Sequence, residues 1–173
     1  ETSHEDLLEL IYNLEPAFYP NDKSEYSNTN YVLLSYIIEE IEGQDYAKSL
    51  QSRIAEPLGL KNTYYGKGIE IANNEASSFQ YVSSWSKLDD SHLSIPSGAG
   101  AIVSTVSDLT IFINSLLTTE KLITSTSLDQ MKTTIDHFGH GLFKVPFYED
   151  SGFGHGGSID GFKSELYYFP ASK

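Results

Sequence analysis

The 173-residue sequence has no cysteine and few basic residues. Without cysteine it can hold no disulfide, no thiolate nucleophile and no cysteine-ligated metal, and this absence fits oxidising and reducing compartments alike. Eleven Lys and Arg stand against 24 Asp and Glu, and the net charge of -13 argues against a surface that binds nucleic acid or anionic lipid. The mean hydropathy of -0.28 also excludes a membrane-span composition. One globular domain is the default expectation.

Capping residues and apolar periodicity predict a mainly helical part over residues 1–136. Ser3 followed by Asp6 is typical of a helix start, and Gly43 is suited to end a second helix. The expected apolar faces recur at helical spacing. They are Leu7, Leu8, Ile11 and Leu14; Tyr31, Leu34, Ile38 and Ile41 with Val32 and Ile37; Tyr46, Leu50 and Ile54; and Leu109, Phe112, Ile113, Leu116 and Leu117.

Two further stretches depart from helical periodicity. From about residue 60 to 100 no period is sustained, which predicts a long irregular region over a surface or a substrate cleft. Over residues 137–173, glycine and aromatic residues predict antiparallel strands at 141–147, 152–157 and 162–169. The sequence therefore predicts an α+β fold in which a helical subdomain is followed by part of an antiparallel sheet. The aromatic last strand is expected to need a partner along its edge.

Tyr26-Ser27-Asn28, at the start of the second predicted helix, is the first cluster that could carry chemistry. A tyrosine two residues before an asparagine can direct a phenol and a carboxamide into one cleft, for proton transfer and for holding an amide carbonyl. The structural alternative is that Ser27, Asn28 or Thr29 only caps the helix while Tyr26 packs against it.

The second cluster is Gly154-His155-Gly156-Gly157-Ser158. Its glycines allow close approach of a ligand to the backbone and can leave an N–H free at a strand edge, as an oxyanion hole requires. A glycine-rich hairpin with an exposed histidine is the structural alternative.

Three other patterns are weaker candidates for a functional site. The small residues from Pro96 to Thr105 predict tight packing before a helix rather than a dinucleotide site, so no cofactor is indicated. Ser84 and Lys87 fit Ser-x-x-Lys but lie where no helical period surrounds them. His137 and His140 lack acidic or cysteine ligands at regular spacing, so no metal site is expected.

Taken in order, these clusters resemble the serine β-lactamase and penicillin-binding protein superfamily, in its branch similar to class C β-lactamases and D-alanyl-D-alanine carboxypeptidases. The resemblance is collective and covers nearly the whole chain. Its segments are Tyr26-Ser27-Asn28, Asn30 to Leu34, Ile37 to Glu39, Gly43, Tyr46, Ile54 to Leu60, Thr63, Ser97 to Gly100, Ser104-Thr105, Asp108, Gly139 to Leu142, His155-Gly156-Gly157, Gly161-Phe162 and Ser164.

The resemblance implies roles for the two clusters. Tyr26 would transfer protons to and from the nucleophile, and Asn28 would orient the substrate amide. His155, with Gly156 and Gly157, would occupy the motif that is Lys-Thr-Gly in many relatives, and the N–H of Ser158 would donate into the oxyanion hole. The family's fold pairs a helical subdomain with an α/β subdomain, and its members usually act outside the cytoplasm on small-molecule or peptide substrates.

One departure from the family pattern shapes the functional hypothesis. In the family a Ser-x-x-Lys helix precedes Tyr-x-Asn, and no such motif occurs in the 25 residues before Tyr26. We therefore expect a fragment of a serine hydrolase that acts on a peptidoglycan peptide, a β-lactam or an ester. It would be inactive alone, would have the missing parts of its parent chain as partners, and would meet a membrane only through an anchor outside this sequence. The alternative is a non-catalytic module that binds peptidoglycan or protein.

Overall fold

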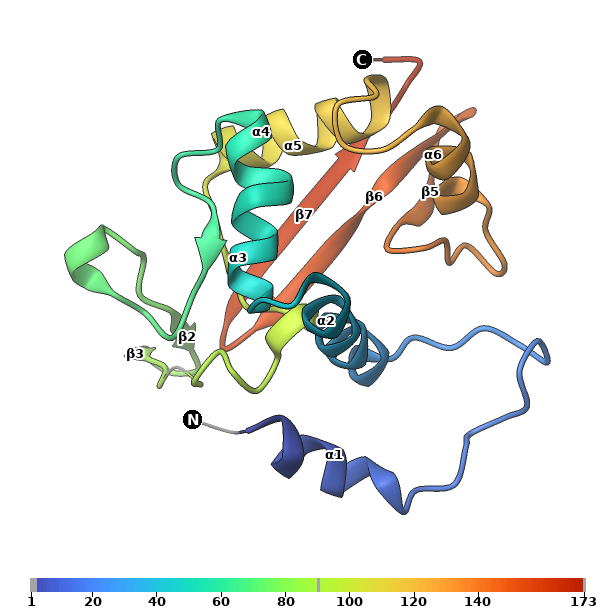
Figure 1. The fold of residues 1–173 in the computed structure, drawn as a ribbon. Helices are drawn as coiled ribbons and strands as arrows, with labels where there is room; N and C mark the ends of the chain where they lie inside the picture. The colour runs from blue at the N-terminus through green and yellow to red at the C-terminus, as the bar shows by residue number, and fades with distance from the viewer. Residues whose placement is uncertain (1–2, 90, 173) are drawn as a thin grey trace.

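The computed structural model describes residues 3–89 and 91–172 and shows helices arranged around a three-stranded antiparallel sheet (Figure 1). The sheet has the order β5-β6-β7, and α5 packs against β7. The helices are α1 (His4–Tyr12), α2 (Asn28–Glu42), α3 (Tyr46–Leu50), α4 (Glu56–Leu58), α5 (Val106–Thr118) and α6 (Ser125–Lys132). The strands of the main sheet are β5 (Phe143–Phe147), β6 (Asp150–Ile159) and β7 (Phe162–Tyr168). The predicted α+β class is confirmed.

Side chains named from the sequence cap the helices. Ser3 forms a capping box with Asp6, and the backbone and hydroxyl of Ser3 lower the pKa of the Asp6 carboxyl through hydrogen bonds. Ser27 caps α2, and Gly43 ends that helix with a φ of 63°. Thr105 caps α5 by accepting from the Asp108 N–H. Each cap satisfies an N–H or carbonyl that the helix itself leaves unpaired, so these boundaries follow from local sequence.

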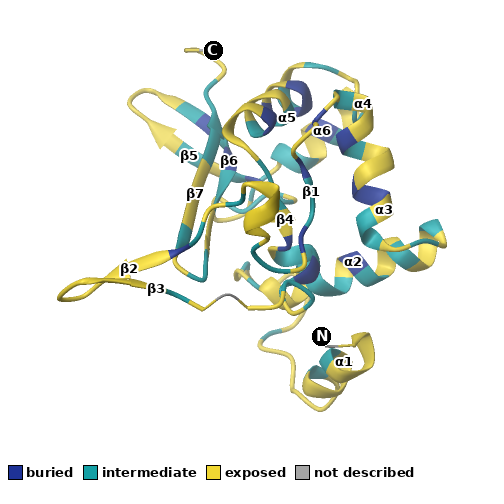
Figure 2. Cartoon of the chain, turned by 90° about the vertical axis from the view of Figure 1, so that its left-hand side faces the viewer, coloured by how far each residue is buried: buried dark blue, intermediate teal, exposed yellow. Residues whose placement is uncertain are grey.

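The buried face of α2 differs from the expected one. Its apolar stripe is largely exposed, and Figure 2 shows α2 mostly in the exposed and intermediate colours. Its buried residue is Ser35, whose hydroxyl lies 3.0 Å from that of Ser97. A Cβ on Gly98 would lie 2.5 Å from the carbonyl oxygen of Tyr31, so the tight packing predicted for this small-residue segment is confirmed. Periodicity predicted the helix, but small residues decide which of its faces is covered. The exposed stripe comprises Leu34, Ile37, Ile38 and Ile41.

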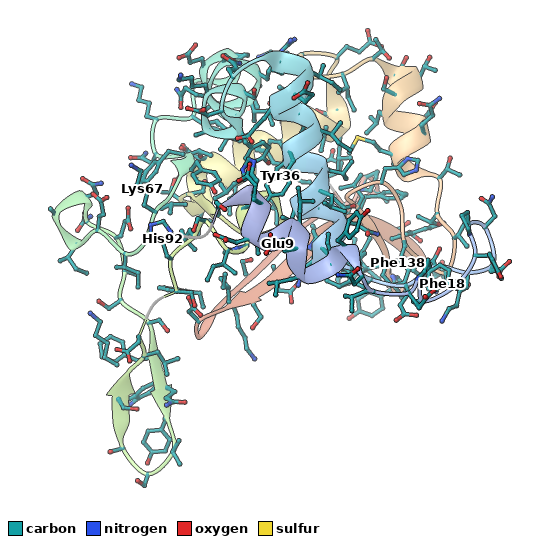
Figure 3. All side chains as sticks on the ribbon, turned by 60° about the horizontal axis from the view of Figure 1, so that its bottom comes forward. Glu9, Phe18, Tyr36, Lys67, His92 and Phe138 are labelled. Carbon is teal, nitrogen blue, oxygen red and sulfur yellow. The ribbon has the colours of Figure 1, made fainter. Side chains whose placement is uncertain are left out.

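The helix α1 lies apart from the sheet (Figure 1) and contacts α2; Glu9 of α1 and Tyr36 of α2 are labelled in Figure 3. The His4 ring stacks on Tyr36 with 3.7 Å between the ring centroids, and His4 Nε2 lies 3.3 Å from a carboxylate oxygen of Glu39. None of the nine residues of α1 is buried, so its predicted apolar face packs only partly. No helix in the described ranges is long and apolar enough to cross a membrane.

The third predicted helix contains a π-helical turn, and the aperiodic region contains short strands, neither of which the sequence predicted. Between α3 and α4 the chain makes a π-helical turn, and Gly59 ends the whole segment in the left-handed conformation. Within residues 60–100, β1 (Tyr64–Tyr65) pairs with β4 (Ile102–Val103), which lies just beyond this stretch. There, too, β2 (Phe79–Tyr81) and β3 (Trp85–Lys87) form an exposed hairpin that projects from the body (Figure 2). The region is thus interrupted by short strands.

A buried carboxylate joins the start of α5 to the segment before β1. Asp108 is 6% exposed and accepts hydrogen bonds from the Asn62 N–H at 2.7 Å and the Thr63 hydroxyl at 3.0 Å. Replacing Asp108 by Ala would leave both donors without this acceptor, and we expect unfolding to become easier by about 2 kcal/mol. Urea denaturation measures the change. Asp129→Ala, which removes an exposed carboxylate from α6, is the control and should cost less than about 1 kcal/mol.

Candidate active site

The side chains of Tyr26 and Asn28 are bonded to each other at the start of α2. The Tyr26 hydroxyl donates to Asn28 Oδ1 at 2.9 Å, while Ser27 Oγ accepts from the Asn30 N–H at 3.3 Å. The capping interpretation of this cluster is therefore right for Ser27 and leaves the phenol and the carboxamide available. Tyr26 as a whole residue is 47% exposed, so the cluster lies at the surface of the described chain.

A hydrogen bond from the next turn of α2 fixes this pair beside the sheet. Tyr31 Oη accepts from the Gly141 N–H at 2.9 Å, although 110 residues separate them in sequence. Gly141 has a φ of 73°, a conformation that favours glycine. Next to it, a Cβ on Gly139 would lie 2.3 Å from the carbonyl oxygen of Met131. The backbone of Gly141 is therefore bonded to the start of α2, while Gly139 allows the chain to pack closely on α6.

The strand β6 has one unpaired edge where the His155 cluster lies. Its pairing with β5 reaches no further than Phe143 opposite Gly154, whereas its pairing with β7 continues to Ile159. The hairpin turn to β7 has two residues, Asp160 and Gly161, both with positive φ. In such a hairpin the residues flanking the turn are hydrogen-bonded to each other and the pattern alternates along the strand. The N–H of Ser158 therefore points away from β7, into the unpaired edge.

The ring of His155 is half-buried and held in one orientation. His155 Nδ1 contacts the carbonyl oxygen of Gly156, and because a carbonyl only accepts, this contact favours the tautomer with the proton on Nδ1. This tautomer leaves Nε2 free to contact another molecule. The ring centroid of His155 lies 6.0 Å from that of Tyr26, so the two sequence clusters come together across the start of α2 and the edge of β6.

The glycines after His155 make room on the strand faces. A Cβ on Gly156 would come within 2.9 Å of a Glu165 carboxylate oxygen, and one on Gly157 within 2.8 Å of Ser164 Oγ. On β7, burial and then the Glu165 carboxylate raise the pKa of the Tyr167 phenol, which keeps that group protonated. Tyr167 is therefore a weaker acid than an ordinary tyrosine.

The structure also brings in a residue that the sequence did not single out. Phe143, the first residue of β5, stacks on His155 with 4.2 Å between ring centroids and contacts the edge of Tyr26 at 6.0 Å. The signal in the sequence was weak: an aromatic residue directly after Gly139-His140-Gly141-Leu142. Only the pairing of Phe143 with Gly154 shows which ring it meets.

The other patterns lie outside this site. Ser84 and Lys87 belong to the exposed β2–β3 hairpin, so they are not one helical turn apart on a helix. His137 and His140 are exposed, and the part of the chain that the structure describes holds no group of three His, Cys, Asp or Glu side chains able to bind a metal ion.

Comparison with known proteins finds one matching family model and several similar hydrolases and penicillin-binding proteins. The family model described as Beta-lactamase matches residues 1–173. The D-stereospecific amidohydrolase from a Streptomyces species is similar, with a TM-score of 0.81 and 29% identity over 91% of this chain and 50% of that one. The D-amino acid amidase from Ochrobactrum anthropi SV3, complexed with L-phenylalanine amide, has a TM-score of 0.72 and 31% identity over 83% of this chain and 46% of that one.

Among curated proteins, penicillin-binding protein 4* of Bacillus subtilis is 39% identical over 62 residues, which are 35% of this chain and 14% of that protein. The chain therefore spans about half the length of the two solved relatives and a smaller share of the curated one.

Proposed function

Because the chain belongs to the Beta-lactamase family, we propose that it forms the proton-transfer and oxyanion side of a serine hydrolase that works through an acyl-enzyme. The observation that supports this most is the Tyr26 hydroxyl, bonded to Asn28 and standing beside His155 at the unpaired edge of β6. Such a site offers a proton-transfer group and an amide-binding group beside His155, with the free N–H of Ser158 three residues further along the same strand.

The proposed reaction divides its steps among these groups. As the nucleophilic serine forms its bond to the substrate carbonyl carbon, its proton passes through the Tyr26 hydroxyl oxygen to the leaving nitrogen, whose bond to carbon breaks. The charge that develops on the carbonyl oxygen would be stabilised by the Ser158 N–H. Asn28 Oδ1 is engaged with Tyr26, so its amide nitrogen is the atom left to donate to the substrate.

We propose an amino-acid amide or a peptide as the substrate, and a peptidoglycan peptide, a β-lactam or a simple ester fits the same chemistry. The similarity to a D-stereospecific amidohydrolase and a D-amino acid amidase favours amides of D-configured amino acids. His155 Nε2 would meet a polar group of the acyl part, such as a carboxylate. Similarity to a penicillin-binding protein supports action outside the cytoplasm as part of this proposal.

The nucleophile would come from outside residues 1–173, since the Ser84 and Lys87 pair lies on a hairpin rather than on a helix. The same observation favours a second candidate, a binding module that keeps the cleft without catalysis. A Ser-x-x-Lys helix encoded in the same reading frame supports the enzyme, and its absence from the complete frame supports the binding module.

The test uses the protein produced from the complete reading frame. We expect labelling by a fluorescent penicillin or a fluorophosphonate, and release of ammonia from D-phenylalanine amide in preference to the L-isomer. Ser84→Ala should leave both signals unchanged. Loss of both with Ser84→Ala would assign the nucleophile to the hairpin, and binding of peptidoglycan peptides without labelling or turnover would favour the binding module.

A further inference from the structure

A ring from a third element contacts both of the proposed catalytic side chains. Phe143 of β5 stacks on His155 with an interplanar angle of 25° and meets Tyr26 at 61°. Tyr26 and His155 come from the start of α2 and from β6. Phe143 therefore touches side chains that precede and follow it by more than ten residues in sequence.

The two side chains also meet each other, with 6.0 Å between ring centroids, and their hydrogen bonds are local. Tyr26 is bonded to Asn28 two residues away, and His155 to the carbonyl of the next residue, Gly156. A contact within one short segment orients a side chain relative to its own backbone but does not fix one segment against another. The Phe143 ring does so, because it packs against both at once.

Phe143 is itself held firmly. Its Cα is opposite Gly154 in the β5–β6 ladder, and its ring contacts Phe138 at 5.4 Å with an interplanar angle of 87°. Phe138, labelled in Figure 3, also forms a β-bridge with Phe143. Backbone pairing on one side and an edge-to-face ring on the other leave the Phe143 side chain little freedom, as a positioning element requires.

We propose that Phe143 is a positioning residue that sets the Tyr26 hydroxyl and the imidazole of His155 at their working separation. The proposal rests on the proposed function for its catalytic consequence, but the geometry it asserts can be measured without any activity. Phe143 does not itself transfer a proton. It acts through the two groups that it contacts.

The first experiment is NMR spectroscopy of the protein, with the imidazole of His155 observed directly. In the unaltered protein we expect its ring protons at high field, because they lie over the Phe143 ring, and its nitrogen shifts to report the Nδ1–H tautomer. Phe143→Leu should remove the high-field shift and weaken the nuclear Overhauser contact between the rings of Tyr26 and His155, while the tautomer, which depends on the Gly156 carbonyl, should persist. Phe143→Tyr, which keeps the ring, should restore both signals.

The matched control is Phe147→Leu, the same change on the same strand at a residue that packs on Tyr148 and Phe169. It should leave the His155 signals unchanged. If Phe143→Leu does not fold, Phe143→Met keeps the volume without the ring and gives the same reading. His155 signals that are identical in folded Phe143→Leu, or Phe143→Met, and the unaltered protein would overturn the proposal.

The second experiment measures turnover of D-phenylalanine amide by the protein from the complete reading frame. Phe143→Leu should lower kcat by at least about 10-fold with a smaller effect on KM, because displacing a catalytic group by about 1 Å can cost as much as ~100-fold. Phe143→Tyr should recover most of the loss. Absence of turnover in the unaltered protein would count against the proposed function alone, because the NMR result stands independently.

Discussion

Tyr26→Phe in the protein from the complete reading frame is expected to lower kcat by about 10²- to 10⁴-fold, the range over which general acid–base groups contribute. The substitution removes one oxygen atom and keeps the ring that contacts Phe143 and His155. The site therefore keeps its shape and loses the atom through which the proton would pass. The measurement is turnover of D-phenylalanine amide, with the burst of acyl-enzyme followed separately.

The matched control is Tyr19→Phe, which removes the same hydroxyl from a tyrosine that is 81% exposed in the segment between α1 and α2. We expect it to leave kcat unchanged. The Tyr26→Phe substitution also removes the donor to Asn28 Oδ1. An unaltered kcat would exclude the phenol from proton transfer. The partner test is Ser27→Ala, which should destabilise α2 through loss of its cap by about 1 kcal/mol with little change in kcat.

The cap and the proposed catalytic groups are adjacent residues, and this is why the sequence could predict the arrangement at the start of α2. Ser27 is the cap, and Tyr26 and Asn28 are its neighbours. A helix start fixes the backbone of a few consecutive residues through local hydrogen bonds, so the identity of three adjacent residues already determines most of their relative positions. The same reasoning applies to the unpaired edge near Ser158, because a two-residue turn such as Asp160-Gly161 sets the hydrogen-bonding pattern of the strand before it.

The parts that the sequence did not predict depend on contacts between distant segments. The stripe from Leu34 to Ile41 has the period of a buried helix face, yet Ser35 is the residue that packs, because Gly98 lets another segment approach. Phe143 was assigned only to a strand, because nothing in its neighbourhood shows that it will lie against His155. Periodicity reports on a residue's own element, whereas these two outcomes depend on which other element lies against it.

Gly154 belongs both to the centre of the sheet and to the cluster that contains His155. Gly154→Ala is expected to be the most destabilising change considered. A Cβ there would lie 1.9 Å from the carbonyl oxygen of Leu166 and 2.7 Å from the Cα of Tyr167. Both are backbone atoms of β7, and Gly154 is also paired with Phe143 on the other side. A shift that relieves the clash must therefore disturb one of the two ladders.

Overpacking of this kind costs about 3 kcal/mol, which for a protein of this size lowers Tm by roughly 6–12 °C. Gly157→Ala on the same strand is the control: its Cβ would meet Ser164 Oγ at 2.8 Å, a side-chain atom that can rotate away. We expect it to change stability by less than about 1 kcal/mol. Thermal unfolding of the two variants compares them directly. If the two variants have the same Tm, β6 can move against β7 to accept the extra methyl group. The direction of the Ser158 N–H, on which the oxyanion role rests, would then not be fixed by the strand pairing.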